Sequence, residues 1–127
     1  MIKQVLDIDS YWEVVVYYNV DYNLFDDILY ELRMIDFPID YINETRRAMM
    51  SREAMAVTCT STKHYTSIIL FNPHTSKADY INSIVHEAEH VKQAMLKAYS
   101  VEDDGEPPAY TIGHLVGRMY EVFSKFI

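Results

Sequence analysis

The amino-acid sequence predicts an α+β fold in a single domain that spans residues 1–127. The length of 127 residues and the hydrophobic content of 50% fit one globular domain. Segments rich in β-branched and aromatic residues alternate with segments of helical periodicity, in the order strand, helix, helix, hairpin, helix, helix. We therefore expect a small sheet of about three strands with helices packed on one face.

The N-terminal half supplies one strand and two helices. Residues 12–20 (WEVVVYYNV) are β-branched and aromatic, which is typical of a strand. Apolar residues then recur at helical spacing over residues 24–35, and this helix ends before Phe37-Pro38. A second, more polar helix is expected over residues 40–50.

The C-terminal half supplies a hairpin and two helices. Residues 54–60 and 65–71 read as two strands joined by a short polar turn. Ser76 or Thr75 is positioned to cap a long helix that runs to about Tyr99. An acidic turn over residues 101–108 then leads into a final helix over residues 109–126, because proline is tolerated in the first turn of a helix.

Composition and charge narrow the classes of function. The formal net charge of −8 argues against binding of nucleic acid or of an anionic membrane by bulk charge. Cys59 is the single cysteine, so an internal disulfide is excluded. No apolar run suits a signal peptide or a membrane span. We expect a cytoplasmic protein without a nucleic-acid or membrane partner.

The long helix contains the motif His86-Glu87-Ala88-Glu89-His90. Residues four apart lie on one face of a helix, so His86 and His90 can bind one zinc ion at about 2.0–2.1 Å. Glu87 lies where a general base for a zinc-activated water belongs. This pattern is the His-Glu-x-x-His signature of metallopeptidases. The alternative is a pair of surface histidines without a metal.

A catalytic zinc needs a third protein ligand, and Glu106 is the first candidate. The acidic turn would bring the final helix back beside the motif helix, so that Glu106 faces the histidines. The zinc site would then lie between the last two helices. The competing carboxylates are in the preceding turn, where an acidic run is usually a solvated loop: Glu102, Asp103 and Asp104.

The final helix carries two further candidates for catalysis. Tyr110 is expected either to stabilise the oxyanion or to pack in the core, and His114 either to donate to the transition state or to be an ordinary core residue. Gly113 and Gly117 are spaced so that two helices could pack closely.

The stretch NSIVHEAEH and the later stretch EPPAYTIGHLVGRMY together resemble a family of small zincin-like proteins found in phages and in Bacteroidales genomes. Members are described as zinc metallopeptidases, and a Glu-x-x-Ala-Tyr-x-x-Gly helix follows their His-Glu-x-x-His helix. The resemblance implies a minimal zincin-like domain with His86, His90 and Glu106 as metal ligands and Glu87 as base. It implies that Ala109, Tyr110 and Gly113 form a helix-packing signature.

The expected activity is zinc-dependent hydrolysis of a peptide bond in a peptide or protein substrate, with Glu87 as general base and Tyr110, His114 or His64 as a second donor. An extended peptide would add to the sheet edge formed by residues 65–70. The alternative is a non-catalytic phage protein, a virion or assembly component, or a partner-binding protein on the same fold. A peptidase of toxin–antitoxin type that cuts one partner is also compatible with the size. The oligomeric state is not predicted.

Overall fold

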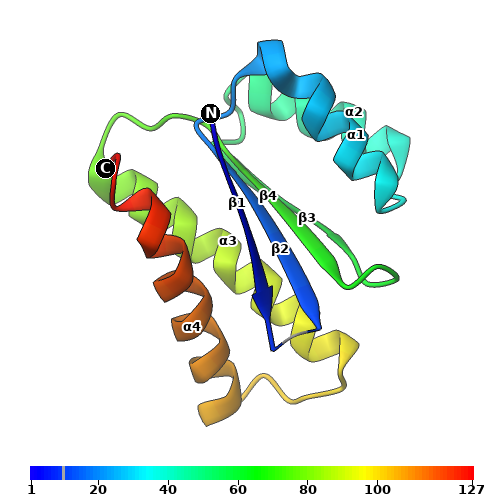
Figure 1. Ribbon diagram of the computed structural model, residues 1–127, viewed down its shortest axis with the longest axis vertical. Helices are drawn as coiled ribbons and strands as arrows, with labels where there is room; N and C mark the ends of the chain where they lie inside the picture. The colour runs from blue at the N-terminus through cyan, green and yellow to red at the C-terminus, as the bar shows by residue number, and fades with distance from the viewer. Residues whose placement is uncertain (10) are drawn as a thin grey trace.

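The computed structural model describes residues 1–9 and 11–127, and this part of the chain contains strands and helices in one α+β unit (Figure 1). None of the helices in this part has the length and apolar character needed to cross a bilayer. The elements in chain order are β1 (Ile2–Ile8), β2 (Trp12–Tyr18), the 3-10 turn η1 (Tyr22–Leu24), α1 (Phe25–Met34), α2 (Ile39–Met50), β3 (Ala56–Ser61), β4 (Thr66–Phe71), α3 (Lys77–Ala98) and α4 (Glu106–Phe123).

The sheet has four strands in the described residues rather than the three expected, in the order β1-β2-β4-β3. β1 pairs with β2 and β3 pairs with β4 in antiparallel fashion, whereas β2 and β4 are parallel. The additional strand is β1, at one edge of the sheet. Only Leu6 and Ile8 of β1 are buried. An edge strand needs few buried side chains, and the sequence of β1 accordingly lacks the dense apolar pattern of a central strand.

Helices cover both faces of the sheet, which corrects the expectation of helices on one face. Figure 1 shows α1 and α2 on one side of the sheet and α3 and α4 on the other. Alternate residues of β2 contribute to the two cores: Val14 and Val16 pack with α3 and α4, and Val15 and Tyr17 pack with α1 and α2. The continuous apolar runs of β2 and β4 reflect burial on both faces.

The helix ends follow local chemistry. Of the two predicted caps of α3, Ser76 is the one observed, because its side chain accepts a hydrogen bond from the backbone N–H of Asp79. α4 begins at Glu106, earlier than expected, and includes Pro107 and Pro108 in its first turn. Gly105 precedes it with a φ of 78°, a conformation that favours glycine.

The interpretation of Gly113 and Gly117 as close-packing positions is wrong. A Cβ atom built on either glycine would meet no heavy atom within 4 Å. Both glycines therefore leave open space beside α4, and the helix-packing signature implied by the resemblance does not bring another helix onto this face. By contrast, Cys59 is fully buried, as a small hydrophobic residue should be, and burial raises the pKa of its thiol to about 12.

Candidate metal and catalytic site

The two motif histidines converge on one point beside α3. The Nε2 atoms of His86 and His90 lie 3.2 Å apart, and their rings meet at an interplanar angle of 80°. Two nitrogen ligands of one tetrahedral zinc ion, each about 2.0–2.1 Å from the metal, are separated by about 3.3 Å. The separation of the two nitrogens therefore fits a pair of zinc ligands.

Glu87 lies directly behind the histidines and is 5% exposed. Its Oε1 accepts a hydrogen bond of 3.0 Å from the Thr58 hydroxyl, which also donates to the backbone carbonyl of Glu87 at 3.4 Å. Its Oε2 lies 3.9 Å from Nε2 of His86. One carboxylate oxygen is thus held by β3, while the other faces the histidine pair.

These residues line a pocket of about 380 Å³ between α3 and β3, which we call the histidine pocket. Its lining residues are Ala56, Val57, Thr58, Thr60, His86, Glu87 and His90. The sequence led us to expect the zinc site between the last two helices. The pair of histidines lies between α3 and β3 instead. The reason is the layout of the sheet, in which α3 packs on β3 and α4 packs on β1 at the opposite edge.

The sheet edge beside the histidine pocket is also a different strand from the one expected. β4 contains most of residues 65–70 and lies between β2 and β3, so its backbone groups are already paired. β3 is the edge strand, and it supplies Thr58 and Thr60 to the pocket. A peptide that adds to the sheet at this site would pair with β3.

The predicted third ligand, Glu106, does not line the histidine pocket; it is exposed in the first turn of α4. Across residues 1–9 and 11–127, no three His, Cys, Asp or Glu side chains gather into a metal-binding group. α3 continues to Ala98, about two turns beyond His90, before the chain turns back. Of the three predicted ligands, the structure therefore brings together only His86 and His90.

One of the competing carboxylates has a structural partner. Asp103 lies 2.9 Å from Nζ of Lys92, which is also 2.6 Å from Glu89. The hydrogen bond from Lys92 to Glu89, followed by the one to Asp103, raises the pKa of the largely buried Lys92 ammonium. Asp103 therefore holds the acidic turn against α3, and Glu89 is half-buried.

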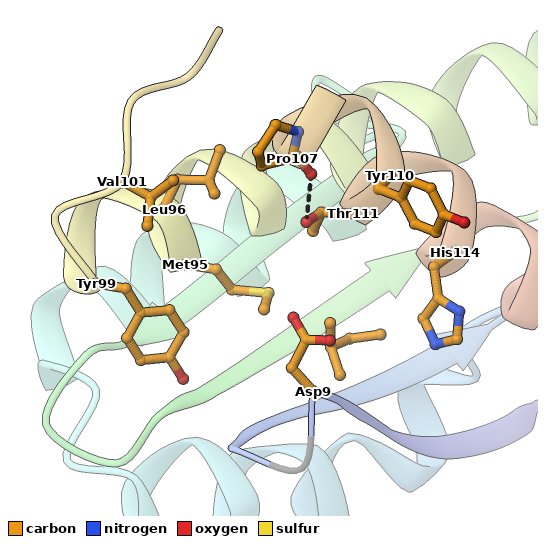
Figure 2. A pocket seen from close by; sticks show the side chains of 10 residues that line it. Asp9, Met95, Leu96, Tyr99, Val101, Pro107, Tyr110, Thr111 and His114 are labelled. Carbon is orange, nitrogen blue, oxygen red and sulfur yellow. Dashed lines mark hydrogen bonds between the residues drawn. The ribbon is translucent and has the colours of Figure 1, made fainter. Parts of the chain in front are cut away.

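Tyr110 and His114 lie in a second pocket, of about 430 Å³, which we call the tyrosine pocket (Figure 2). Its lining residues are Ile8, Asp9, Met95, Leu96, Tyr99, Val101, Pro107, Tyr110, Thr111 and His114. It is formed by the end of β1, the C-terminal end of α3 and the start of α4. Neither Tyr110 nor His114 lines the histidine pocket, so the structure does not bring them to Glu87.

Tyr99 is held in the tyrosine pocket by aromatic packing. Its ring lies 6.0 Å from the buried Trp12 in an edge-to-face arrangement and stacks on Tyr65 at 6.5 Å. Burial, the neighbouring Tyr65 and the Asp9 carboxylate raise the pKa of the Tyr99 hydroxyl. Asp9 is therefore close enough to Tyr99 to affect its ionisation.

The remaining histidines, His64 and His74, make contacts outside the two pockets. Nε2 of His64 lies 2.8 Å from the Asp36 carboxylate near the β3–β4 turn. His74 is half-buried, and its ring nitrogens lie 2.7 Å from the Asn72 carbonyl and 2.8 Å from the Ser83 hydroxyl. The two contacts of His74 link the segment that precedes α3 to the first turns of that helix.

Sequence reasoning missed Thr58, which orients the proposed base. Thr58 is 29 positions from Glu87 along the chain, and nothing local marks it among the other threonines of the hairpin. The parity of its strand gave the one available hint, because Cys59 is buried toward α1 and α2 and its neighbour Thr58 must face α3.

No family model, curated protein or solved structure matches this chain. Its function is therefore inferred from the geometry of the two pockets.

Proposed function

We propose that the protein is a zinc-dependent peptidase whose active site is the histidine pocket. The observation that carries the proposal is the convergence of two imidazole nitrogens 3.2 Å apart beside a buried carboxylate. A buried carboxylate next to two helix-borne histidines is the arrangement that the His-Glu-x-x-His chemistry requires.

His86 and His90 would hold the ion in this site. Bound there, zinc would supply a Lewis acid that polarises a carbonyl group and makes water more acidic. Glu106 can join the two histidines only if the first turn of α4 moves away from its place beyond the end of α3. Variants of Glu106 and Glu102, described in the Discussion, separate these two arrangements.

Glu87 would act as general base and then as general acid. Its Oε1 is occupied by the Thr58 hydroxyl, so Oε2 is the oxygen available to take a proton from the attacking water. The same oxygen would then give the proton to the leaving amine. Thr58 is a positioning residue, because it fixes the carboxylate without touching the reacting atoms.

The free edge of β3 offers a way to hold a peptide across the site. β3 runs beside the histidine pocket and lies at the edge of the sheet. An extended peptide that pairs with β3 would have its backbone carbonyls beside His86 and Glu87. This mode of binding selects unfolded or loop segments as substrates, since the backbone N–H and C=O groups of such segments are free to pair with β3.

Hydrolysis of a mixed peptide library by the zinc-loaded protein, followed by mass spectrometry, tests the proposal. We expect the Glu87→Gln variant to bind zinc as the parent does and to lose hydrolysis, because glutamine cannot take the proton. The matched control is Glu89→Gln, on the same helix and outside the pocket, which should stay active. A Glu87→Gln variant as active as the parent would contradict the mechanism.

A second candidate function is supported by the lack of a third ligand beside His86 and His90 in the described residues. In this alternative the protein binds a partner, such as a component of a virion, and does no chemistry. Zinc-loaded protein that cleaves nothing in the library, and that forms a stable complex with an intact peptide along β3, would favour the alternative.

A further inference from the structure

The tyrosine pocket has the composition of a ligand site that is separate from the histidine pocket. Its floor is aliphatic and comes from three parts of the chain: Ile8 of β1, Met95 and Leu96 of α3, and Val101 and Pro107 beside the acidic turn. A cavity of about 430 Å³ lies in the range of about 300–1,000 Å³ that is usual for small-molecule sites. The pocket is therefore large enough for a ligand with an aliphatic body.

The polar groups around this floor favour a cation. In Figure 2, the Asp9 carboxylate points into the pocket across from Met95, with Tyr99 on one side and His114 on the other. Tyr99 and Tyr110 also line the pocket, and the face of a tyrosine ring attracts a positive charge. Among the described residues that line the pocket, none is Lys or Arg.

The C-terminal end of α3 at the pocket acts in the same direction. Leu96 and Tyr99 lie at the C-terminal end of α3, which is the negative end of the helix dipole. Pro107 and Pro108 remove two N–H groups from the first turn of α4, which weakens that end as an anion site. The adjoining segment 102–106 carries four carboxylates and no basic residue.

We propose that the tyrosine pocket binds a protonated primary amine on an aliphatic chain. The aliphatic chain lies on the floor formed by Ile8, Met95 and Leu96. The ammonium group pairs with the Asp9 carboxylate and lies against the rings of Tyr99 and Tyr110. Such an ammonium occurs both in free alkylamines and in the lysine side chain of a peptide, and it is fully protonated at neutral pH because its pKa is about 10.4.

The test is a titration of the full-length protein with three matched probes, followed by NMR of the backbone amides and methionine methyl groups. The probes are hexylammonium, neutral 1-hexanol and the hexanoate anion. We expect hexylammonium to shift the signals of Met95, Thr111 and His114 in a saturable manner. Hexanol and hexanoate should bind at least about 10-fold more weakly than hexylammonium, because they lack the ion pair and the cation–π contact.

Two variants with matched controls locate the binding groups. Asp9→Asn should weaken hexylammonium about 10-fold, and it keeps the fold because asparagine tolerates the positive φ of 54° at this position. Asp7→Asn, two residues earlier on β1 and outside the pocket, is its control. Tyr110→Ala should weaken binding several-fold relative to Tyr120→Ala, since both tyrosines are exposed on α4 and only Tyr110 lines the pocket.

Each outcome bears on the amine directly. Equal binding of hexanol and hexylammonium, equal effects of Asp9→Asn and Asp7→Asn, or no saturable shift with any amine would overturn the proposal. A fourth probe, N-acetyl-lysine-N-methylamide, distinguishes the two sources of the ligand. Tighter binding than hexylammonium identifies a lysine side chain of a peptide as the ligand, and weaker binding identifies a free amine. All these readouts are independent of zinc.

Discussion

The two pockets lie on either side of α3 and are built in opposite ways. In the histidine pocket, three of the polar groups come from one helix within little more than a turn, and β3 holds the central carboxylate with the Thr58 hydroxyl. In the tyrosine pocket, the polar and aromatic groups come from the ends of β1, α3 and α4.

This difference decides what a spacing along the chain can establish. His86 and His90 are brought together by the geometry of one helix, so their convergence needs no knowledge of the rest of the fold. Tyr110 and His114 share α4 with Glu106. Their positions therefore depend on the side of α3 against which α4 packs. The spacing of a motif within one helix therefore predicts which side chains lie close together more reliably than a motif divided between two elements.

The largest expected effect is on zinc affinity, which should depend on a histidine of the histidine pocket and not on the histidine of the tyrosine pocket. His86→Ala should lower zinc affinity by about 100-fold or more, because loss of even an outer partner of a zinc ligand costs about 10–100-fold. His114→Ala, in the tyrosine pocket, should leave zinc affinity unchanged. Isothermal titration with zinc measures both. Equal losses would mean that the two pockets meet in solution and that α4 binds on the other side of α3.

The acidic residues near α4 refine this result. Glu106→Ala should weaken zinc binding no more than Glu102→Ala, because both side chains are exposed outside the histidine pocket. A loss confined to Glu106→Ala would show instead that the first turn of α4 moves and completes the site.

A smaller effect is expected from the residue that orients Glu87. Thr58→Val removes the hydroxyl that donates to Oε1, and we expect kcat on a cleaved peptide to fall about 10-fold, a part of the 10²–10⁴-fold that a positioned base contributes. KM and zinc affinity should change little. Thr111→Val on α4, whose hydroxyl bonds the Pro107 carbonyl, is the control. If the two variants lose activity equally, the effect is one of stability and not of orientation.

The smallest effect concerns the glycines of α4. Gly113→Ala should raise the free energy of unfolding by about 0.5–1 kcal/mol, because alanine loses less backbone entropy in a helix and its methyl group meets no atom here. Gly105→Ala should lower it, since its φ of 78° strains any residue with a Cβ. Urea denaturation followed by circular dichroism measures both changes. Destabilisation by Gly113→Ala would reveal a packing partner on this face of α4.

The sequence correctly predicted the elements that have strong local signals. It failed where packing against other elements determines the structure. α3 was expected from Ser76 to about Tyr99 and runs from Lys77 to Ala98, because its cap and apolar period are both local. β1 was missed because an edge strand buries few of its side chains. Helices were expected on one face, although the unbroken apolar runs of β2 and β4 indicate burial on both.

The candidate site divides in the same way. The convergence of His86 and His90 beside Glu87 follows from the helical period alone. Thr58 was out of reach, since its bond to Glu87 depends on how β3 aligns with α3. The position of Glu106 depends on how far α3 extends past His90 and on which strand α4 packs against, and neither is written in the motif.

The aromatic packing of Tyr99 gives the protein a built-in optical reporter. Trp12 is the only tryptophan of the chain and is fully buried. Its ring centroid lies 6.0 Å from that of Tyr99 and 6.1 Å from that of Tyr65. Excitation energy absorbed by these tyrosines passes to a single indole, whose emission then depends on the wall of the tyrosine pocket. A ligand that displaces Tyr99 would change the intensity of that emission, and unfolding would shift it to the red, so the two events can be read separately from one unlabelled sample.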